Sequence, residues 1–317
     1  MRLWRARIDR FLAAGIVPII DPESTWWHTI DLEYIVKTMD EKGVAQVCFA
    51  PNFQLGSETS LKLHERYPEH FIPTSADASS FHWDRTPRQF LDRIIADHAG
   101  GRYFLMGEYE LRHYPSNQQW LAGNLGRDIT LPWDHEAVLA LFNYSQEHRV
   151  AFTIHLEIED EAMDGLEKLL ERYPGALVIW AHLGQRAFPE RSKLYGVEYI
   201  RGLIQRFPNL HFDLGAVAFP AFQHPANKAS GHYTHTLYAY TSERYDGHLL
   251  REWRDLMNAH PERFLIAFDM DSTRWRNFLP NVIDRFRYLI LRELDERAQH
   301  LLAYRNAWRL ITGEPWK

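Results

Sequence analysis

The chain has 317 residues, of which 45% are hydrophobic and 25% are charged, so it can bury a full core. Its net charge is -6 and its lysines and arginines are scattered, which argues against a nucleic-acid partner. No apolar run approaches the length that crosses a bilayer, so we expect no membrane-spanning segment.

The N-terminus and the cysteine content indicate a cytoplasmic protein. Asp9 and Arg10 interrupt the apolar stretch near the N-terminus and no small-residue cleavage site follows. We therefore predict a short helix there and not a signal peptide. The sole cysteine, Cys48, lies in an apolar run and cannot form an internal disulfide, which suits a reducing compartment. We expect it to be a small buried apolar residue and not a nucleophile.

Short stretches rich in Val, Ile, Phe and Leu recur along the chain, as is typical of parallel strands that are covered by helices. They predict eight strands, at residues 17–21, 44–51, 71–77, 102–111, 151–157, 176–183, 210–216 and 264–270. Between them, helix start signals such as Asp31 and stop signals such as Gly43 mark helical segments. The predicted helices are 31–42, 57–67, 86–98, 134–148, 160–172, 195–206, 247–259 and 277–291, with a closing helix near 295–311.

This alternation predicts an α/β protein in which residues 1–317 form a single (β/α)₈ TIM barrel domain. An open doubly wound sheet is the structural alternative. Its best sequence signature is a glycine-rich turn from strand to helix, and neither G-x-G-x-x-G nor G-x-x-x-x-G-K-[ST] occurs in this chain. The sequence therefore favours the barrel.

Two connections, 112–133 after the fourth strand and 217–246 after the seventh, are longer than usual and fall on the active-site side of a barrel. We predict that both are lids. The second carries His224 and several tyrosines, a mixture suited to contact with a small organic ligand. Its His232-x-x-His235 pair favours hydrogen bonding or substrate contact over metal binding, because it lies in a loop.

Polar side chains follow nearly every predicted strand. In chain order they are Asp21 and Glu23, Asn52, Asp77, Glu108 and Glu110, His155 and Glu157, His182, Asp213, and Asp269 and Asp271. Any one carboxylate of this kind can simply cap a helix or pair with an arginine. Several at one barrel mouth would repel one another unless protons or a cation neutralised them. The pattern indicates a divalent metal such as Zn²⁺, Mn²⁺, Fe²⁺ or Co²⁺, with an open position for water or substrate.

The chain resembles the amidohydrolase superfamily, in particular the group of amidohydrolase-related decarboxylases and lactonases. The similar segments are 35–44, Gly107-Glu108-Tyr109-Glu110-Leu111, His155, Trp180-Ala181-His182-Leu183-Gly184, 263–269 and Asn306-Ala307-Trp308-Arg309-Leu310, so the resemblance spans the whole chain. The resemblance implies that His155 is a metal ligand and that His182 is a second ligand or polarises the substrate. It also implies that Asp269 is the metal-bound acid/base.

One segment departs from the family pattern. The family's first strand ends in Asp-x-His-x-His, whereas this chain has Asp21-Pro22-Glu23-Ser24-Thr25. In one account Glu23 replaces a histidine and Glu108 completes an oxygen-rich site with His155 and Asp269, which suits Mn²⁺ or Fe²⁺. In the other account the metal is lost.

The resulting hypothesis is a metal-dependent hydrolase of an amide, ester or lactone bond in a small ring-containing substrate. One alternative is a metal-dependent decarboxylase of an aromatic or unsaturated carboxylic acid, and another is a metal-free barrel that only binds ligands. Candidate substrate contacts are Arg112, His113, His224, Arg274 and Trp26. The sequence leaves open whether the chain forms a homo-oligomer.

Overall fold

The computed structural model describes residues 1–26, 31–52, 55–78, 81–115, 119, 121–123, 125–184, 191–215, 238–240, 247–270 and 280–317. Its strands are β1 (Ile19–Trp26), β2 (Val44–Pro51), β3 (Met106–His113), β4 (Ile129–Thr130), β5 (Ala151–Leu156), β6 (Leu177–Trp180), β7 (Leu210–Asp213), β8 (Tyr238–Tyr240), β9 (Gly247–Leu249) and β10 (Phe264–Leu265).

The longer helices are α1 (Arg2–Ala13), α2 (Leu32–Lys42), α3 (Glu58–Arg66), α4 (Phe81–Arg85), α5 (Pro87–Ala99), α7 (Glu136–His148), α8 (Asp160–Arg172), α9 (Val197–Arg206), α10 (Arg251–Ala259), α12 (Glu296–His300) and α13 (Asn306–Thr312). Short helical turns are η2 (Ala181–Leu183), η5 (Pro261–Arg263), η6 (Phe286–Ile290), η7 (Leu291–Glu293) and η8 (Leu301–Arg305). None of these described helices is long and apolar enough to cross a membrane.

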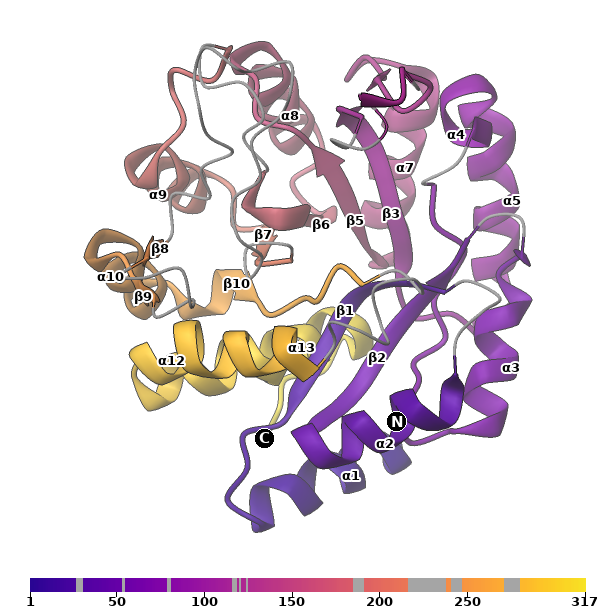
Figure 1. Ribbon diagram of the computed structural model, residues 1–317. Coiled ribbons are helices and arrows are strands. Elements are labelled where there is room, and N and C mark those ends of the chain that lie inside the picture. The colour runs from indigo at the N-terminus through magenta and orange to yellow at the C-terminus, as the bar shows by residue number, and fades with distance from the viewer. Residues whose placement is uncertain are drawn as a thin grey trace.

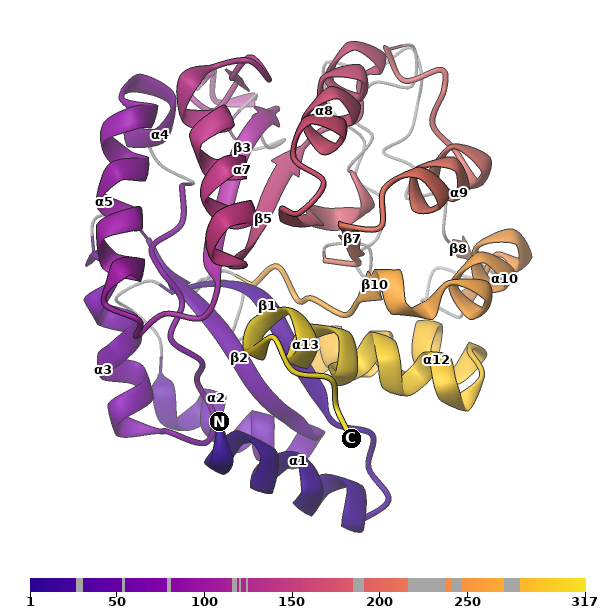
Figure 2. The ribbon, with the colours of Figure 1, turned by 180° about the vertical axis from the view of Figure 1, so that it is seen from behind.

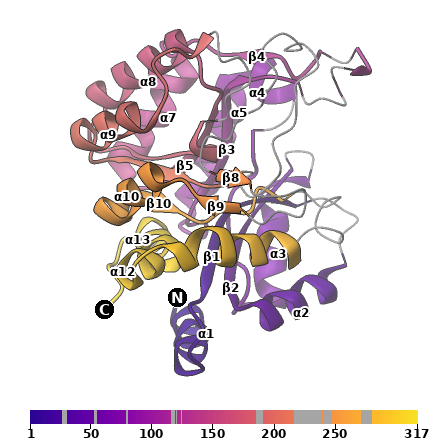
Figure 3. The same cartoon turned by 60° about the vertical axis from the view of Figure 1, so that its left-hand side comes forward.

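The strands close into the (β/α)₈ barrel that the sequence predicts. Parallel pairing joins β1 to β2, and a second parallel series runs β3-β5-β6-β7-β10. Single bridges complete the ring, because Val47 pairs with Phe71, Thr74 with Leu105, and Ser24 with Met270. Helices cover the outside of the ring, with α3 and α5 beyond β2 and β3 (Figure 1), and α7, α8, α9 and α10 following one another along one side (Figure 3).

The third predicted strand, 71–77, occupies its expected place but is not a regular strand. Pro73 lies in its middle and has no N–H to donate to a neighbouring strand. The segment still bonds on both sides, with Ile72 N–H donating to the Val47 carbonyl and Ser75 N–H donating to the Leu105 carbonyl. The barrel therefore closes through an extended segment here.

Other element boundaries also differ from the sequence prediction. The strand predicted at 102–111 begins at Met106 and continues to His113. Within the connection 112–133, residues 129–130 form the antiparallel strand β4 beside it, because a short return hairpin can pair with an exposed strand edge. The strand predicted to reach residue 183 ends at Trp180, where the chain turns into η2. The helix predicted from 247 begins at Arg251, because residues 247–249 pair with β8. The last strand is regular only over Phe264–Leu265.

Helix α1 closes the lower end of the barrel, opposite the strand ends that carry the polar residues. Its Arg7 guanidinium donates to the carbonyls of Val44 and Ala45, where β2 begins. Its Trp4 indole donates to the Pro68 carbonyl. Both chain termini lie at this same end (Figure 2). The predicted N-terminal helix is thus part of the packed structure.

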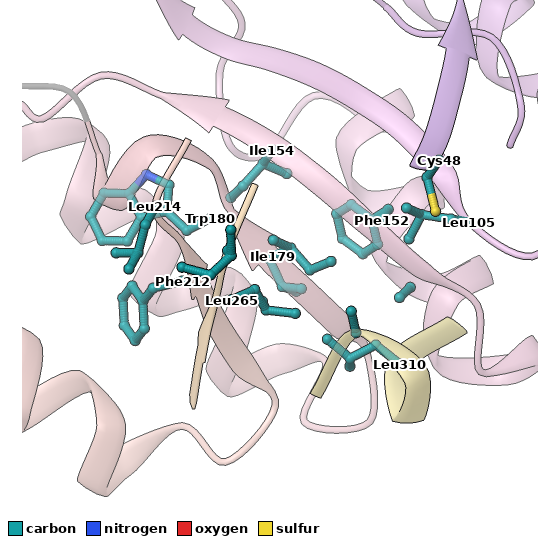
Figure 4. Close-up of a cluster of buried hydrophobic side chains, with 14 of the residues drawn as sticks. Cys48, Leu105, Phe152, Ile154, Ile179, Trp180, Phe212, Leu214, Leu265 and Leu310 are labelled. Atoms are coloured by element: carbon teal, nitrogen blue, oxygen red, sulfur yellow. The ribbon is translucent and has the colours of Figure 1, made fainter. Parts of the chain in front are cut away.

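The hydrophobic core continues through the strands and out to the helices. Figure 4 shows one buried cluster in which Phe152 and Ile154 of β5, Ile179 of β6 and Leu265 of β10 lie together, with Cys48 at its edge. The Phe152 ring also meets the Phe142 ring of α7 at 5.0 Å, which joins strand to helix. Cys48 is fully buried, as the sequence predicts for a small apolar residue.

A buried histidine in α5 lowers the stability of the folded protein at acid pH. Burial outweighs a hydrogen bond to the Leu105 backbone and lowers the pKa of His98 to about 4. An unfolded histidine has a pKa of about 6.5. Because the folded-state pKa is depressed, the unfolded chain binds more protons between these values, and stability is lost as the pH falls through this window.

The unfolding free energy of the wild type falls between pH 7.5 and pH 5. We predict that this fall is about 2 kcal/mol smaller in His98→Leu. Urea unfolding of both proteins at the two pH values measures this difference. His148→Leu, which replaces an exposed histidine of α7, serves as the control and should follow the wild type. Equal acid sensitivity of the wild type and His98→Leu would contradict the assignment.

Candidate active site at the barrel mouth

Five ionisable side chains from five of the eight positions around the barrel meet near the strand ends. They are Glu23 of β1, Glu108 of β3, His155 of β5, His182 of η2 and Asp213 of β7, and we call them the central cluster. All but Glu108 are less than 9% exposed. In a (β/α)₈ barrel this end of the strands carries the active site, so the central cluster is the candidate active site.

Glu108 holds the two histidines together. Nδ1 of His155 lies 2.8 Å from Glu108 Oε1, and Nε2 of His182 lies 3.3 Å from the same oxygen. Because an ionised carboxylate only accepts hydrogen bonds, both of these nitrogens carry the donated proton. The two imidazole rings lie 4.9 Å apart. The ring nitrogens that do not face Glu108 are Nε2 of His155 and Nδ1 of His182.

Glu23 and Asp213 flank the other side of His182. Glu23 Oε2 lies 3.7 Å from His182 Nδ1. Asp213 Oδ1 accepts the backbone N–H groups of His182 at 2.8 Å and Gly215 at 2.9 Å. Two backbone donors therefore fix the Asp213 carboxylate and leave its second oxygen facing away from them.

Backbone strain marks two of the predicted functional residues. His182 and Asp269 have φ angles of 58° and 48°, in the left-handed region that few non-glycine residues adopt. Each such residue costs about 1 kcal/mol or more, and such residues gather at functional sites. Contacts across the barrel hold both, since Asp269 N–H donates to the Glu23 carbonyl and His182 N–H donates to Asp213.

Burial and mutual charge dominate the electrostatics of the central cluster. Burial, followed by the negative charges of Asp213 and Glu108, holds the pKa of Glu23 well above its usual range. Burial raises the pKa of Asp213 to about 6. Burial also opposes charge on Glu108, but the hydrogen bonds and charges of His155 and His182 outweigh it and hold the pKa of Glu108 well below its usual range.

The two histidines respond in the opposite direction. Burial opposes their protonation, but the hydrogen bond to Glu108 outweighs it and raises the pKa of His155 to about 10. The pKa of His182 is raised as well, because the charge of Asp269 and the bond to Glu108 outweigh burial. In the absence of a cation, protons on these groups offset the carboxylate charges.

The donor set fits a divalent metal. Within the described residues, two groups of three side chains have ligand atoms within 4.8 Å of one another: Glu108, His155 and His182, and Glu23, His182 and Asp213. Several of their buried polar atoms have no hydrogen-bond partner, namely both oxygens of Glu23, His155 Nε2, His182 Nδ1 and Asp213 Oδ2. Buried groups without partners are unfavourable, and a cation would satisfy them.

The other predicted site residues differ in their relation to the central cluster. Asp269 belongs to neither three-residue group, although its charge acts on Glu23 and His182. The His113 ring lies 4.6 Å from the His155 ring and is therefore beside the central cluster. His224 and Arg274 lie outside the described residues.

Arg112 and Trp26, predicted as substrate contacts, make local contacts. The Arg112 guanidinium donates to the Asp128 carboxylate and the Ile129 carbonyl of the β4 hairpin and stacks 3.5 Å from the Tyr114 ring centroid. The Trp26 ring meets the Phe49 ring at 5.4 Å and is buried. Their roles toward a substrate stay predictions.

Two residues near the central cluster received no role from the sequence. Asp213 was recognised only as one more carboxylate at a strand end. Arg127, whose side chain pairs with the buried Glu110 carboxylate and lies 3.3 Å from His113 Nε2, comes from the turn before β4. Nothing in the local sequence indicates this contact, because it depends on the hairpin between β3 and β4.

The fold is similar to that of several solved structures. A 2,6-dihydroxybenzoate decarboxylase from Rhizobium matches with a TM-score of 0.57 and 10% identity over 94% of this chain and 99% of that chain. An amidohydrolase from Burkholderia multivorans with bound zinc matches with a TM-score of 0.56 and 10% identity over 93% and 99%. A probable 2-pyrone-4,6-dicarboxylic acid hydrolase from Acinetobacter baumannii matches with a TM-score of 0.53 and 13% identity over 93% and 99%.

These similarities confirm the predicted resemblance at the level of the fold. No protein-family model matches the sequence, and a search of curated proteins finds no similar sequence. At 10–13% identity the matches establish the barrel, and one barrel supports many reactions. The chemistry therefore rests on the residues of the mouth.

Asp21 fixes the first strand at this mouth. Its fully buried carboxylate accepts from Glu23 N–H at 3.1 Å, Ser24 Oγ–H at 2.6 Å and Phe268 N–H at 2.9 Å. We predict that Asp21→Ala lowers the unfolding free energy by about 3 kcal/mol, because it leaves these buried donors unpaired.

Urea unfolding measures this loss, and Asp21→Asn is the matched control. The amide oxygen of Asn can still accept both backbone N–H groups, so we expect a loss of about 1 kcal/mol. Wild-type stability in Asp21→Ala would show that other contacts hold the strand end.

Proposed function

We propose that this protein is an enzyme, a metal-dependent hydrolase of an amide, ester or lactone bond in a small ring-containing substrate. The observation that carries the proposal is the set of buried donor atoms without hydrogen-bond partners on Glu23, His155, His182 and Asp213. They gather at the end of the barrel where such folds carry out catalysis. The structural similarity to a zinc-containing amidohydrolase supports the same reaction class.

A divalent ion in the central cluster would polarise the bond to be cleaved and lower the pKa of water toward neutrality. The candidate residues to hold it are Glu23, Glu108, His155, His182 and Asp269, with His182 common to both three-residue groups. Zn²⁺, Mn²⁺ and Fe²⁺ all accept such mixtures of imidazole and carboxylate.

The remaining groups of the chain have roles in orientation and proton transfer. Glu108 orients both imidazoles through hydrogen bonds, as outer carboxylates do for metal-bound histidines. Asp269 accepts the proton of the attacking water, because its charge already acts on Glu23 and His182 at the mouth. His113, beside His155, is a proposed substrate contact.

Decarboxylation of an aromatic acid is the second candidate reaction. The observation that favours it is the structural match to 2,6-dihydroxybenzoate decarboxylase. In this reaction the substrate carboxylate would bind at the same cluster. Release of CO₂ separates the two reactions, since hydrolysis produces none.

We predict that the purified protein binds one equivalent of Zn²⁺, Mn²⁺ or Fe²⁺ and cleaves dihydrocoumarin, an aromatic lactone, in a metal-dependent manner. Elemental analysis and turnover are measured before and after dialysis against a chelator and after metal is restored. In parallel, 2,6-dihydroxybenzoate is tested for CO₂ release.

His182→Asn should lower metal affinity by at least about 10-fold, because the residue belongs to both groups and Asn tolerates its left-handed backbone. His64→Asn, in α3 outside the mouth, is the control and should bind metal normally. Turnover that survives complete removal of metal would contradict the metal-dependent mechanism and indicate metal-free catalysis.

A further inference from the structure

Gly215, two residues after β7, leaves open a space that three donor atoms face. A Cβ atom on this residue would lie 2.7 Å from Glu23 Oε2, 2.9 Å from His182 Nδ1 and 3.0 Å from Asp213 Oδ1. These approaches are closer than real Cβ atoms make. The backbone of Gly215 is not in the left-handed region, so glycine is needed here for space and not for backbone conformation.

The donors around this space come from three different parts of the barrel and are each held in place. A register shift in β1 between Asp21 and Ser24 carries Glu23, whose N–H is bound by Asp21. Two backbone N–H groups hold Asp213 through Oδ1, which leaves Oδ2 without a partner. Both oxygens of Glu23 are also without hydrogen-bond partners and are buried.

The hydrogen bonds of Glu108 distinguish the two three-residue groups. In the group of Glu108, His155 and His182, the carboxylate already accepts from both rings. In the group of Glu23, His182 and Asp213, both oxygens of Glu23, His182 Nδ1 and Asp213 Oδ2 have no such bonds. Metal-binding histidines usually donate their other ring N–H to a carboxylate, and His182 does this toward Glu108 while its Nδ1 faces Glu23.

We propose that the divalent ion binds between Glu23, His182 Nδ1 and Asp213 Oδ2, in front of Gly215, that Glu108 orients His182, and that neither Glu108 nor His155 ligates the ion. The inference rests on the proposed function and names its ligands. Asp213, on β7, is the ligand that the sequence does not assign. Two carboxylates and one imidazole form an oxygen-rich set that suits Mn²⁺ or Fe²⁺.

The 3.7 Å between Glu23 Oε2 and His182 Nδ1 agrees with this arrangement. This separation is longer than a hydrogen bond, so the two atoms are not bonded to each other. The 2.8 Å between Glu108 Oε1 and His155 Nδ1 is the length of a hydrogen bond and leaves no room for an ion between them.

The test measures Mn²⁺ binding by calorimetry and by the electron paramagnetic resonance of free Mn²⁺. Gly215→Ala should weaken Mn²⁺ binding at least about 10-fold, because the methyl group takes up the space between the donors. Asp213→Asn should weaken it about 10- to 100-fold while its amide oxygen keeps the two backbone hydrogen bonds. Gly202→Ala, in α9 where an added methyl group would meet no atom within 4 Å, is the matched control and should bind like the wild type.

His155→Asn separates the two possible positions of the ion, and we expect it to retain Mn²⁺ affinity within about threefold. Circular dichroism and thermal unfolding show whether each variant is folded, and Mn²⁺ should raise the melting temperature of His155→Asn but not of Asp213→Asn.

Loss of binding in His155→Asn with normal binding in Asp213→Asn would place the ion beside Glu108 and overturn the inference, while the proposed hydrolase would remain. Normal binding in both Gly215→Ala and Asp213→Asn would also overturn it. If Mn²⁺ binds as expected and dihydrocoumarin is not hydrolysed, the proposed function fails and the metal site stands.

Discussion

The hydrogen bonds of the Asp21 carboxylate are the constraint on which the mouth of this barrel depends. They join the end of β1 to Phe268 beyond β10, so the first and last strands of the ring meet at a fixed point. A charged or polar group that is fully buried must satisfy its bonding capacity within the protein, and here three donors do so. The same contacts set the path of the chain through Glu23 and toward Asp269.

Glu108 plays a comparable part on the opposite side of the mouth. One oxygen accepts from two imidazoles, which fixes the ring orientation of both histidines and determines which nitrogen of each faces away from Glu108. The strained backbone of His182 is tolerated because Asp213 accepts its N–H group. The orientation of each catalytic candidate therefore depends on a residue from another strand.

The proposed site would hold a metal without the two histidines that end the first strand of the family that the sequence resembles. Glu23 stands where the family has a histidine, and Asp213 supplies a second carboxylate from β7. Gly215 leaves the space between them open. The change from imidazole to carboxylate moves the donor set toward metals that prefer oxygen.

The sequence by itself determined the barrel, the order of its strands and the strand ends that carry polar residues, because the apolar periodicity and the turn signals are local. It also predicted that His155, His182 and Asp269 would converge, with Glu23 and Glu108 as further candidate metal ligands, since parallel strands end on one face. Only the tertiary structure decided which atoms are paired. His155 and Glu108 are 47 residues apart, and the proton positions depend on that contact. Likewise, the importance of Gly215 arises from side chains of distant strands, so no local pattern could reveal it.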